Sequence, residues 1–260
     1  MKALMQPQIR TKDVDSLKFA AGTDRGLIRE INEDSYRILP GSSESPCVFI
    51  IADGMGGHNC GEVASSMAVA HLGEAITSEG AGICSSKDVG AELRRLVEDT
   101  NRVVFDKSLE RPEVNGMGTT LTMAVIDGNT ITAAHVGDSR LYLIRKGKMQ
   151  QLTEDHSYIG ELVKKGSLTR EEAEHHPGKN IITRAIGSSR DLEVDILSLK
   201  IDREDIFMLC TDGLTNMLGE DEIYNVIVEN DPETACSELI EAAKTKGGED
   251  NITVIVINCE

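Results

Sequence analysis

Five aspartates in this 260-residue sequence have side chains and a setting that suit shared chemistry. Asp53, Asp138, Asp212 and Asp250 each stand beside an apolar run and within two residues of a glycine, and Asp34 lies near another predicted strand edge. An aspartate at a strand end can simply stabilise a turn, because its carboxylate bonds nearby backbone groups. That structural role explains any one of them alone, whereas five in one chain suggest a common site.

Convergence of these carboxylates would require a bound cation. Each close pair would repel by roughly 4 kcal/mol at an effective dielectric near 20. Several such pairs would offset most of a typical folding stability of ~5–15 kcal/mol. Hard divalent cations such as Mg²⁺ or Mn²⁺ remove that repulsion, because they favour carboxylate, carbonyl and water oxygens. The pattern therefore indicates a divalent-cation site.

Two further residues could act on a phosphate group. Arg29 lies five positions before Asp34, and a guanidinium can hold a phosphate through two parallel hydrogen bonds. His58 follows Asp53 by five positions. It could give a proton to a leaving alkoxide, since the ordinary pKa of histidine is ~6.5. Taken singly, an arginine or a histidine is usually a surface or structural residue, so both are candidates only beside the cation site.

The hydrophobic pattern predicts the elements that must position these residues. An apolar run at residues 47–52 predicts a buried strand that leads into a glycine-rich turn at residues 53–57. Apolar residues recur every three or four positions over residues 62–77 and 88–109, which predicts two helices with one buried face each.

The rest of the chain predicts antiparallel sheet. Asp127-Gly128 and Lys146-Gly147 are short hairpin turns, and strands joined by such turns must be antiparallel because parallel neighbours need a long crossover. The predicted strands cover residues 119–126, 130–136, 141–145, 149–152, 193–199, 206–210 and 252–258, and two further helices cover 220–229 and 232–244. Antiparallel sheet with grouped helices predicts an α+β layered protein.

Composition narrows the class of protein. The net charge of −17 repels polyanions, so no nucleic-acid partner is expected. No apolar run approaches the roughly 18 residues of a membrane-spanning helix, and the first residues lack the apolar core of a secretory signal. Six scattered cysteines without a Cys-x-x-Cys pair suit free thiols in the cytoplasm. We expect a cytoplasmic protein that does not enter a membrane.

Six short motifs occur in a fixed order along the chain. They are Arg29 with Asn32-Glu33-Asp34, Asp53-Gly54-Met55-Gly56-Gly57-His58, Gly118-Thr119-Thr120, Gly137-Asp138-Ser139-Arg140, Thr211-Asp212-Gly213 and Asp250-Asn251. Each motif alone is weak. Their order and spacing over residues 21–258 resemble the PPM family of metal-dependent protein phosphatases (type 2C), in particular its compact bacterial members.

The resemblance implies a fold and a division of the chain. The fold would be a four-layer α-β-β-α sandwich, in which two antiparallel sheets pack face to face with helices outside. Residues 1–20 would form an N-terminal extension and residues 21–260 a single phosphatase domain. Within that domain, residues 153–190 resemble the small inserted flap subdomain of the bacterial enzymes.

The resemblance also implies a ligand set for Mn²⁺ or Mg²⁺. Asp53 would bridge two core ions, and the backbone carbonyl of Gly54 would complete the shell of one of them. Asp212 and Asp250 would hold the other ion. Asp138, together with Asp212, would hold a third and weaker ion.

The implied reaction is direct hydrolysis of phosphoserine or phosphothreonine in proteins by a metal-bridging hydroxide. Asp34 would orient metal-bound water, Arg29 would hold the phosphate, and His58 would protonate the leaving oxygen. By the same resemblance, the partners would be phosphorylated proteins, namely a cognate serine/threonine kinase and its substrates. We expect the protein to be a monomer.

Two alternatives remain open at this point. One is a catalytically inactive, metal-binding regulatory module of the same fold, and the other is a hydrolase of small phosphate esters or phosphodiesters that uses the same metal chemistry. A cysteine-dependent phosphatase is disfavoured, because no cysteine is followed six positions later by an arginine.

Overall fold

The computed structural model describes residues 4–5, 17–42, 45–56, 60–78, 83, 88–110, 112–169, 172, 176, 178 and 181–260. Its strands form two antiparallel sheets. The first contains, in spatial order, β1 (Leu4–Met5), β2 (Leu17–Asp24), β12 (Ile252–Cys259), β11 (Ile206–Cys210), β8 (Arg140–Arg145) and β9 (Lys148–Gln151). The second contains β10 (Asp195–Lys200), β7 (Thr130–Val136), β6 (Leu121–Asp127), β4 (Cys47–Met55) and β3 (Asp34–Leu39), with the short β5 (Gly118–Thr119) paired to β4.

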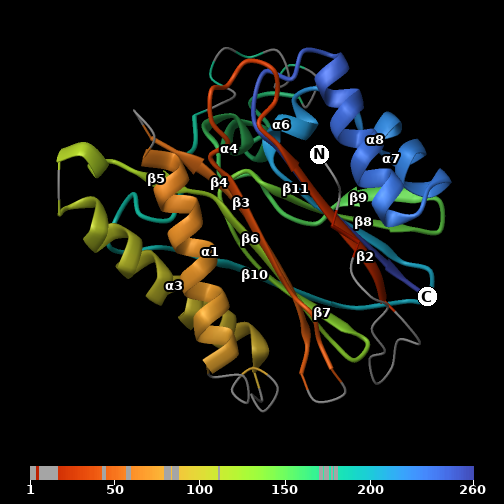
Figure 1. The fold of residues 1–260 in the computed structure, drawn as a ribbon, viewed down its shortest axis with the longest axis horizontal. Coiled ribbons are helices and arrows are strands. Elements are labelled where there is room, and N and C mark those ends of the chain that lie inside the picture. Colours follow the sequence, from red (N-terminus) through yellow and green to blue (C-terminus); the bar gives the residue numbers. More distant parts are fainter. Residues whose placement is uncertain are drawn as a thin grey trace.

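Helices cover the outer face of each sheet (Figure 1). The helices α1 (Cys60–Ser78) and α3 (Val89–Ser108) contact the second sheet through β3, β4, β7 and β10. On the other side, α7 (Glu220–Glu229) packs on α8 (Pro232–Thr245), which contacts β2 and β12 of the first sheet. The described part of the chain also contains three short helices, namely the 3-10 helix Pro112–Val114, α4 (Tyr158–Lys164) and α6 (Asp212–Thr215). The α-β-β-α layering and the α+β class expected from the sequence are confirmed.

The strand sequences explain why the sheets are covered on both faces. Successive side chains of a strand point to opposite faces. In β4, Val48 and Ile50 therefore join the core under α1 and α3, whereas Phe49 and Ile51 join the core between the sheets. Phe49 meets Phe19 of β2 across the interior, with ring centroids 5.2 Å apart in an edge-on arrangement. A third apolar core lies between the first sheet and the helices α7 and α8.

Most predicted elements occur within one or two residues of their expected bounds, but strand β3 was expected only as an edge near Asp34, without bounds, and strand β2 was not predicted at all. It pairs with β12 along its whole length, from Leu17 opposite Cys259 to Asp24 opposite Ile252. The expected boundary between residues 20 and 21 therefore falls inside a strand. The sequence Leu17–Asp24 contains two alanines and a glycine, which have low strand propensity. A Cβ atom at Gly22 would lie 2.6 Å from Cδ1 of Ile240, so a larger residue there would make that side chain shift.

Two other features bear on the expected properties. None of the described helices is both long and apolar enough to cross a membrane. The cysteines of the described part of the chain are buried free thiols, namely Cys47, Cys60, Cys210, Cys236 and Cys259.

Candidate metal centre

Adjacent strands of the second sheet place Asp34 beside Asp53. The register of β3 and β4 puts the two residues directly opposite each other, and side chains of such a pair lie on the same face of the sheet. Asp53 was expected in a turn, but β4 continues through it to Met55 because Gly54 and Met55 pair with β5. The strand therefore fixes its backbone on both sides.

The Gly118-Thr119-Thr120 motif holds the backbone of Asp53. The Asp53 N–H donates to Thr120 Oγ1 at 2.9 Å. Its carbonyl oxygen accepts from Thr119 Oγ1 at 2.8 Å and from the Thr120 N–H at 2.9 Å. Because the backbone donor and acceptor of Asp53 are both bonded to one motif, its carboxylate leaves the strand in a fixed direction.

The other three aspartates lie at the ends of further strands. Asp138 is buried in the turn between β7 and β8, Asp212 is the first residue of α6 directly after β11, and Asp250 precedes β12. The Asp212 carboxylate accepts from Asn216 Nδ2 at 2.9 Å. Strands β11 and β12 belong to the first sheet, whereas β3 and β4 belong to the second. The carboxylates therefore come from both sheets.

These carboxylates interact electrostatically, which places them in one cluster. Burial, and then repulsion from Asp34, Asp212 and Asp138, raises the pKa of Asp53 well above its ordinary value. Burial and the neighbouring charge of Asp212 raise the pKa of Asp138 to about 8. Burial and the charge of Asp250 likewise raise the pKa of Asp212. The charged form of the cluster is therefore unfavourable without a compensating positive charge.

Asp34 has one bonded and one unbonded carboxylate oxygen. Its Oδ2 accepts from Thr253 Oγ1 at 2.6 Å and from Thr211 Oγ1 at 2.9 Å. Its Oδ1 is buried and has no partner among the described residues. Burial raises the pKa of Asp34 to about 7, although the two threonine hydrogen bonds oppose this. A buried carboxylate oxygen without a donor is costly, and a bound water or cation would satisfy it.

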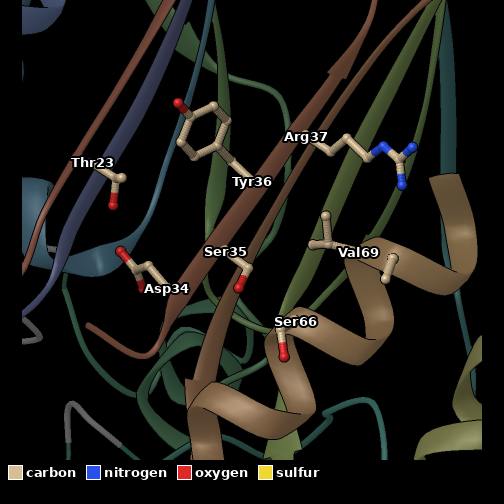
Figure 2. Close-up of a pocket in the computed structure, with 8 residues that line it drawn as sticks. Thr23, Asp34, Ser35, Tyr36, Arg37, Ser66 and Val69 are labelled. Carbon is tan, nitrogen blue, oxygen red and sulfur yellow. The ribbon is translucent and has the colours of Figure 1, made fainter. Parts of the chain in front are cut away.

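Asp34 also lines a groove of about 370 Å³ where the two sheets meet α1 (Figure 2). Thr23 of β2 lies near Asp34 in this view, and Ser66 and Val69 come from α1. Asp34 is the one carboxylate of the cluster among the residues that line the groove. The groove therefore lies beside the cluster and does not enclose it.

Arg29 lies at the edge of the cluster. Its guanidinium donates to Asp250 Oδ2 at 2.8 Å, and 48% of its side chain is exposed. A second carboxylate, that of Glu33, lies 4.0 Å from Arg29 Nη1, beyond hydrogen-bond distance, so the exposed guanidinium still has free N–H donors. Arg29 is thus positioned to meet an anion that approaches the carboxylates from solvent.

Asn251 organises the loop that carries Arg29, a role that was not predicted. Its Nδ2 donates to the carbonyl oxygens of Arg25 and Ile31, both at 2.9 Å. Its Oδ1 accepts from the Glu33 N–H at 2.8 Å. The side chain is buried and uses both of its polar atoms on backbone of one loop. Asn251 directly follows Asp250, which marks it as a candidate in the sequence, but a sequence does not show which loop an asparagine side chain bonds.

The remaining predicted residues are Gly54 and His58. A Cβ atom on Gly54 would lie 2.1 Å from the carbonyl oxygen of Gly61, so no larger residue fits between β4 and the start of α1. His58 lies outside the described residues. The structure therefore brings together Asp34, Asp53, Asp138, Asp212 and Asp250, with Arg29 beside them.

The donor set suits a hard cation. The cluster offers carboxylate oxygens, which Mg²⁺ and Mn²⁺ prefer. Within the described ranges, no three His, Cys, Asp or Glu side chains already form a complete site for one ion. Such a cation needs no complete protein cage, because Mg²⁺ keeps several waters and is commonly held by one or two carboxylates. The unbonded Asp34 oxygen and the mutual repulsion of the cluster both fit a bound cation.

A family model described as Protein phosphatase 2C matches residues 27–242, which is most of the chain. The chain belongs to the protein phosphatase 2C family. The resemblance inferred from the six motifs is confirmed.

Named relatives of this 2C-family chain are bacterial. The serine/threonine phosphatase stp of Listeria welshimeri is 39% identical over 236 residues, which cover 90% of this chain and 93% of the relative. The crystal structure of the Mycobacterium tuberculosis serine/threonine phosphatase PstP/Ppp superimposes with a TM-score of 0.84 at 35% identity, covering 94% of this chain and 99% of that one. Another structure contains the catalytic domain of PstP with two manganese ions; it has a TM-score of 0.82 at 34% identity, covering 93% and 97% of the two chains.

Proposed function

We propose that this 2C-family phosphatase hydrolyses phosphoserine and phosphothreonine in proteins and depends on divalent cations. The observation that carries the proposal is the cluster of five aspartates from two sheets, with an unbonded buried oxygen on Asp34 and the exposed Arg29 beside it. Family membership and the serine/threonine phosphatases among the named relatives support the same substrate class.

The residues that would hold cations follow from the cluster. We assign Asp53, Asp212 and Asp250, with the carbonyl of Gly54, to two core ions, and Asp138 with Asp212 to a third. The manganese-containing PstP structure supports Mn²⁺, and Mg²⁺ suits the same oxygen donors. When bound, such cations neutralise the carboxylates and acidify water for direct attack on phosphorus, without a phosphoenzyme.

The other site residues would bind and orient the substrate. Arg29 would form hydrogen bonds to two phosphate oxygens with its free N–H groups and so spread the charge that develops during transfer. Asp34 would hold the attacking water through its unbonded Oδ1, because its Oδ2 is already occupied by two threonines. His58 is assigned as the proton donor to the serine or threonine oxygen that leaves.

The expected biological setting is bacterial signalling. We propose that the substrates include a serine/threonine kinase of the same cell and the proteins it phosphorylates, and that the enzyme acts as a cytoplasmic monomer. Size-exclusion chromatography with light scattering tests the oligomeric state, since a monomer has a mass of 28.2 kDa.

A metal-dependent assay tests the function. We expect the full chain to hydrolyse para-nitrophenyl phosphate and a phosphothreonine peptide with Mn²⁺, and to lose both activities with EDTA or with Asp53→Asn. Absence of turnover at every Mn²⁺ or Mg²⁺ concentration would instead identify an inactive regulatory module. Faster hydrolysis of nucleotides than of the phosphopeptide would identify a small-ester or phosphodiester hydrolase.

A further inference from the structure

His156 is a buried residue for which the proposed reaction has no use. It lies between β9 and α4, close to the start of the segment that resembles a flap, and 7% of it is exposed. It makes a two-way contact with Gly137. Its Nδ1 accepts from the Gly137 N–H at 3.0 Å, and its own backbone N–H donates to the Gly137 carbonyl oxygen at 2.8 Å. One residue of this segment therefore bonds both polar groups of Gly137.

Gly137 directly precedes Asp138 in the turn between β7 and β8. Its φ is +109°, and a Cβ atom there would lie 2.6 Å from the Thr120 side chain. Thr120 also accepts the backbone N–H of Asp53. The turn is consequently held between Thr120 on one side and His156 on the other, and its position sets where Asp138 meets the cluster.

The contact requires one tautomer of His156. Its Nδ1 accepts a hydrogen bond from an N–H group, so the ring proton of the neutral imidazole must be on Nε2. Asp195 Oδ2 lies 3.2 Å from Nε2 and can accept that proton. Arg184 Nη1 lies 3.0 Å from the same nitrogen, but a guanidinium only donates. Its better partner is Asp195 Oδ1 at 2.7 Å. Asp195 therefore selects the tautomer that bonds Gly137.

A second histidine packs against the ring of His156. His135 of β7 lies under it, with ring centroids 4.8 Å apart. The Nε2 of His135 is 3.1 Å from the carbonyl oxygen of Glu154, and its Nδ1 is 2.9 Å from Thr122 Oγ1. A carbonyl only accepts, so His135 carries its proton on Nε2 and donates it to Glu154. These bonds fix the backbone two residues before His156.

We infer that His156 is a positioning residue that fixes the Gly137–Asp138 turn against the segment after β9, with Asp195 selecting the required tautomer. The inference rests on the proposed function, in which Asp138 helps to hold a cation. Residues that orient a metal ligand commonly contribute about 10- to 100-fold in metal affinity or activity.

Asp195 provides a matched pair of variants in the full chain. Its side chain is 45% exposed, so substitutions there should fold. Asp195→Ala leaves Arg184 as the partner of Nε2 and so favours the tautomer with its proton on Nδ1, which cannot accept from Gly137. Asp195→Asn keeps a carbonyl oxygen that can accept from Nε2. We expect the Mn²⁺ concentration for half-maximal hydrolysis to rise about 10-fold or more in Asp195→Ala and to stay near the wild-type value in Asp195→Asn.

Substitutions of the ring test the same contact. The side-chain oxygen of Asn occupies roughly the place of Nδ1, so His156→Asn should keep the bond to Gly137. His156→Gln places its polar group near Nε2 and should lose it. We expect the Mn²⁺ concentration for half-maximal hydrolysis to rise above the wild-type value in His156→Gln but not in His156→Asn.

Hydrogen exchange of the Gly137 amide supplies a readout that needs neither metal nor activity. In metal-free protein this amide should be protected in the wild type and in Asp195→Asn, and should exchange faster in Asp195→Ala. Equal exchange and equal Mn²⁺ requirement in the two Asp195 variants would overturn the role of His156. A wild-type protein without any turnover would contradict the proposed function instead, whatever the exchange result.

Discussion

At the scale of single residues, two threonines present the Asp34 carboxylate to the site. Thr211 and Thr253 both donate to Oδ2. Thr253 donates its one hydroxyl proton to Asp34. The hydroxyl of Thr23, whose oxygen lies 2.8 Å from that of Thr253, must therefore donate to Thr253. Asn32 Nδ2 in turn donates to Thr23 at 2.8 Å. This chain of donors leaves Oδ1 free for water.

Removing one of these hydroxyls should impair catalysis. Thr253→Val keeps the shape of the buried side chain but removes a donor to Asp34. Because that hydrogen bond lowers the pKa of Asp34, its loss should raise the pKa above the present value of about 7. We expect kcat/KM with Mn²⁺ to fall about 10-fold or more. Thr253→Ser, which keeps the hydroxyl, is the control; equal losses in both variants would contradict this role.

Asp53 should show opposite effects on activity and on stability. Asp53→Asn removes one charge from a repelling cluster, so it should stabilise the metal-free protein while it abolishes turnover. The gain should be on the order of 1–3 kcal/mol, since a close carboxylate pair costs up to roughly 4 kcal/mol at an effective dielectric near 20. Urea unfolding in EDTA measures it. Asp221→Asn is the control, because it removes an exposed charge on α7 and should not stabilise the protein. A similar gain in stability in this variant would show that the effect comes from net charge and not from the cluster.

At the scale of elements, the loop at residues 25–33 depends on Asn251 for its shape. The asparagine bonds backbone groups of Arg25, Ile31 and Glu33, which lie on both sides of Arg29. Asn251→Ala leaves these three groups without their partner, so the loop should no longer hold Arg29 at the cluster.

A double-mutant cycle tests whether Asn251 acts through Arg29. We expect Asn251→Ala to raise KM for a phosphothreonine peptide about 10-fold, as loss of an orienting residue commonly does. If it acts through Arg29, the double variant with Arg29→Ala should be little worse than Arg29→Ala alone. Fully additive losses would show that the two residues act independently.

Strand β2 should contribute strongly to the stability of the fold. Leu17 and Phe19 are almost completely buried, and both belong to the core between the sheets. A chain that begins at residue 21 lacks half of the strand that pairs with β12. It should lose more than about 5 kcal/mol, since each large core side chain contributes about 2–5 kcal/mol. Deletion of residues 1–16 is the control, because it removes β1 but leaves β2 and its pairing with β12 intact. Thermal unfolding of both chains gives the comparison.

At the scale of the whole molecule, the cluster exists only where the two sheets are packed together. Asp34 and Asp53 belong to strands of the second sheet, whereas Asp212 and Asp250 adjoin strands of the first. In the unfolded chain these carboxylates are solvated and far apart, so the ordinary pKa of 3.8 applies to Asp34, Asp53 and Asp212. Folding without a cation therefore forces charges together, and stability must depend on pH.

The direction of that dependence follows from the pKa shifts. The pKa values of Asp34 and Asp138 are raised to about 7 and about 8, so ionisation of the folded state costs stability as pH rises from about 4 to 8. The pKa of His135 is lowered to about 4, chiefly by burial. Neutral His135 therefore contributes stability that is fully present above pH 6.5 and is lost as pH falls towards 4. The two effects oppose each other below pH 6.5, and above it the carboxylates dominate.

We therefore expect the metal-free protein to lose stability between pH 6.5 and 8. Mn²⁺ should reverse the trend, because cations bind deprotonated carboxylates and their stabilisation grows with pH. Urea unfolding at several pH values, with EDTA and with Mn²⁺, measures both curves. Rising stability of the EDTA-treated protein over this range would contradict the clustering of the carboxylates. In the Asp138→Asn variant the slope should be shallower.

The sequence by itself determined the local elements and the inventory of reactive residues. Hairpin turns such as Asp127-Gly128 and helical periodicity act between neighbours in the chain, so β6 to β9 and the four long helices were predictable. The six ordered motifs also sufficed to identify the family. Only the tertiary structure decided strand β2, whose alanines and glycine give little local signal, and the partners of Asn251 and His156. Thr253 and Asp34 show the reason: they bond across 219 positions of sequence, and such a pairing follows from how the two sheets pack, which no local pattern encodes.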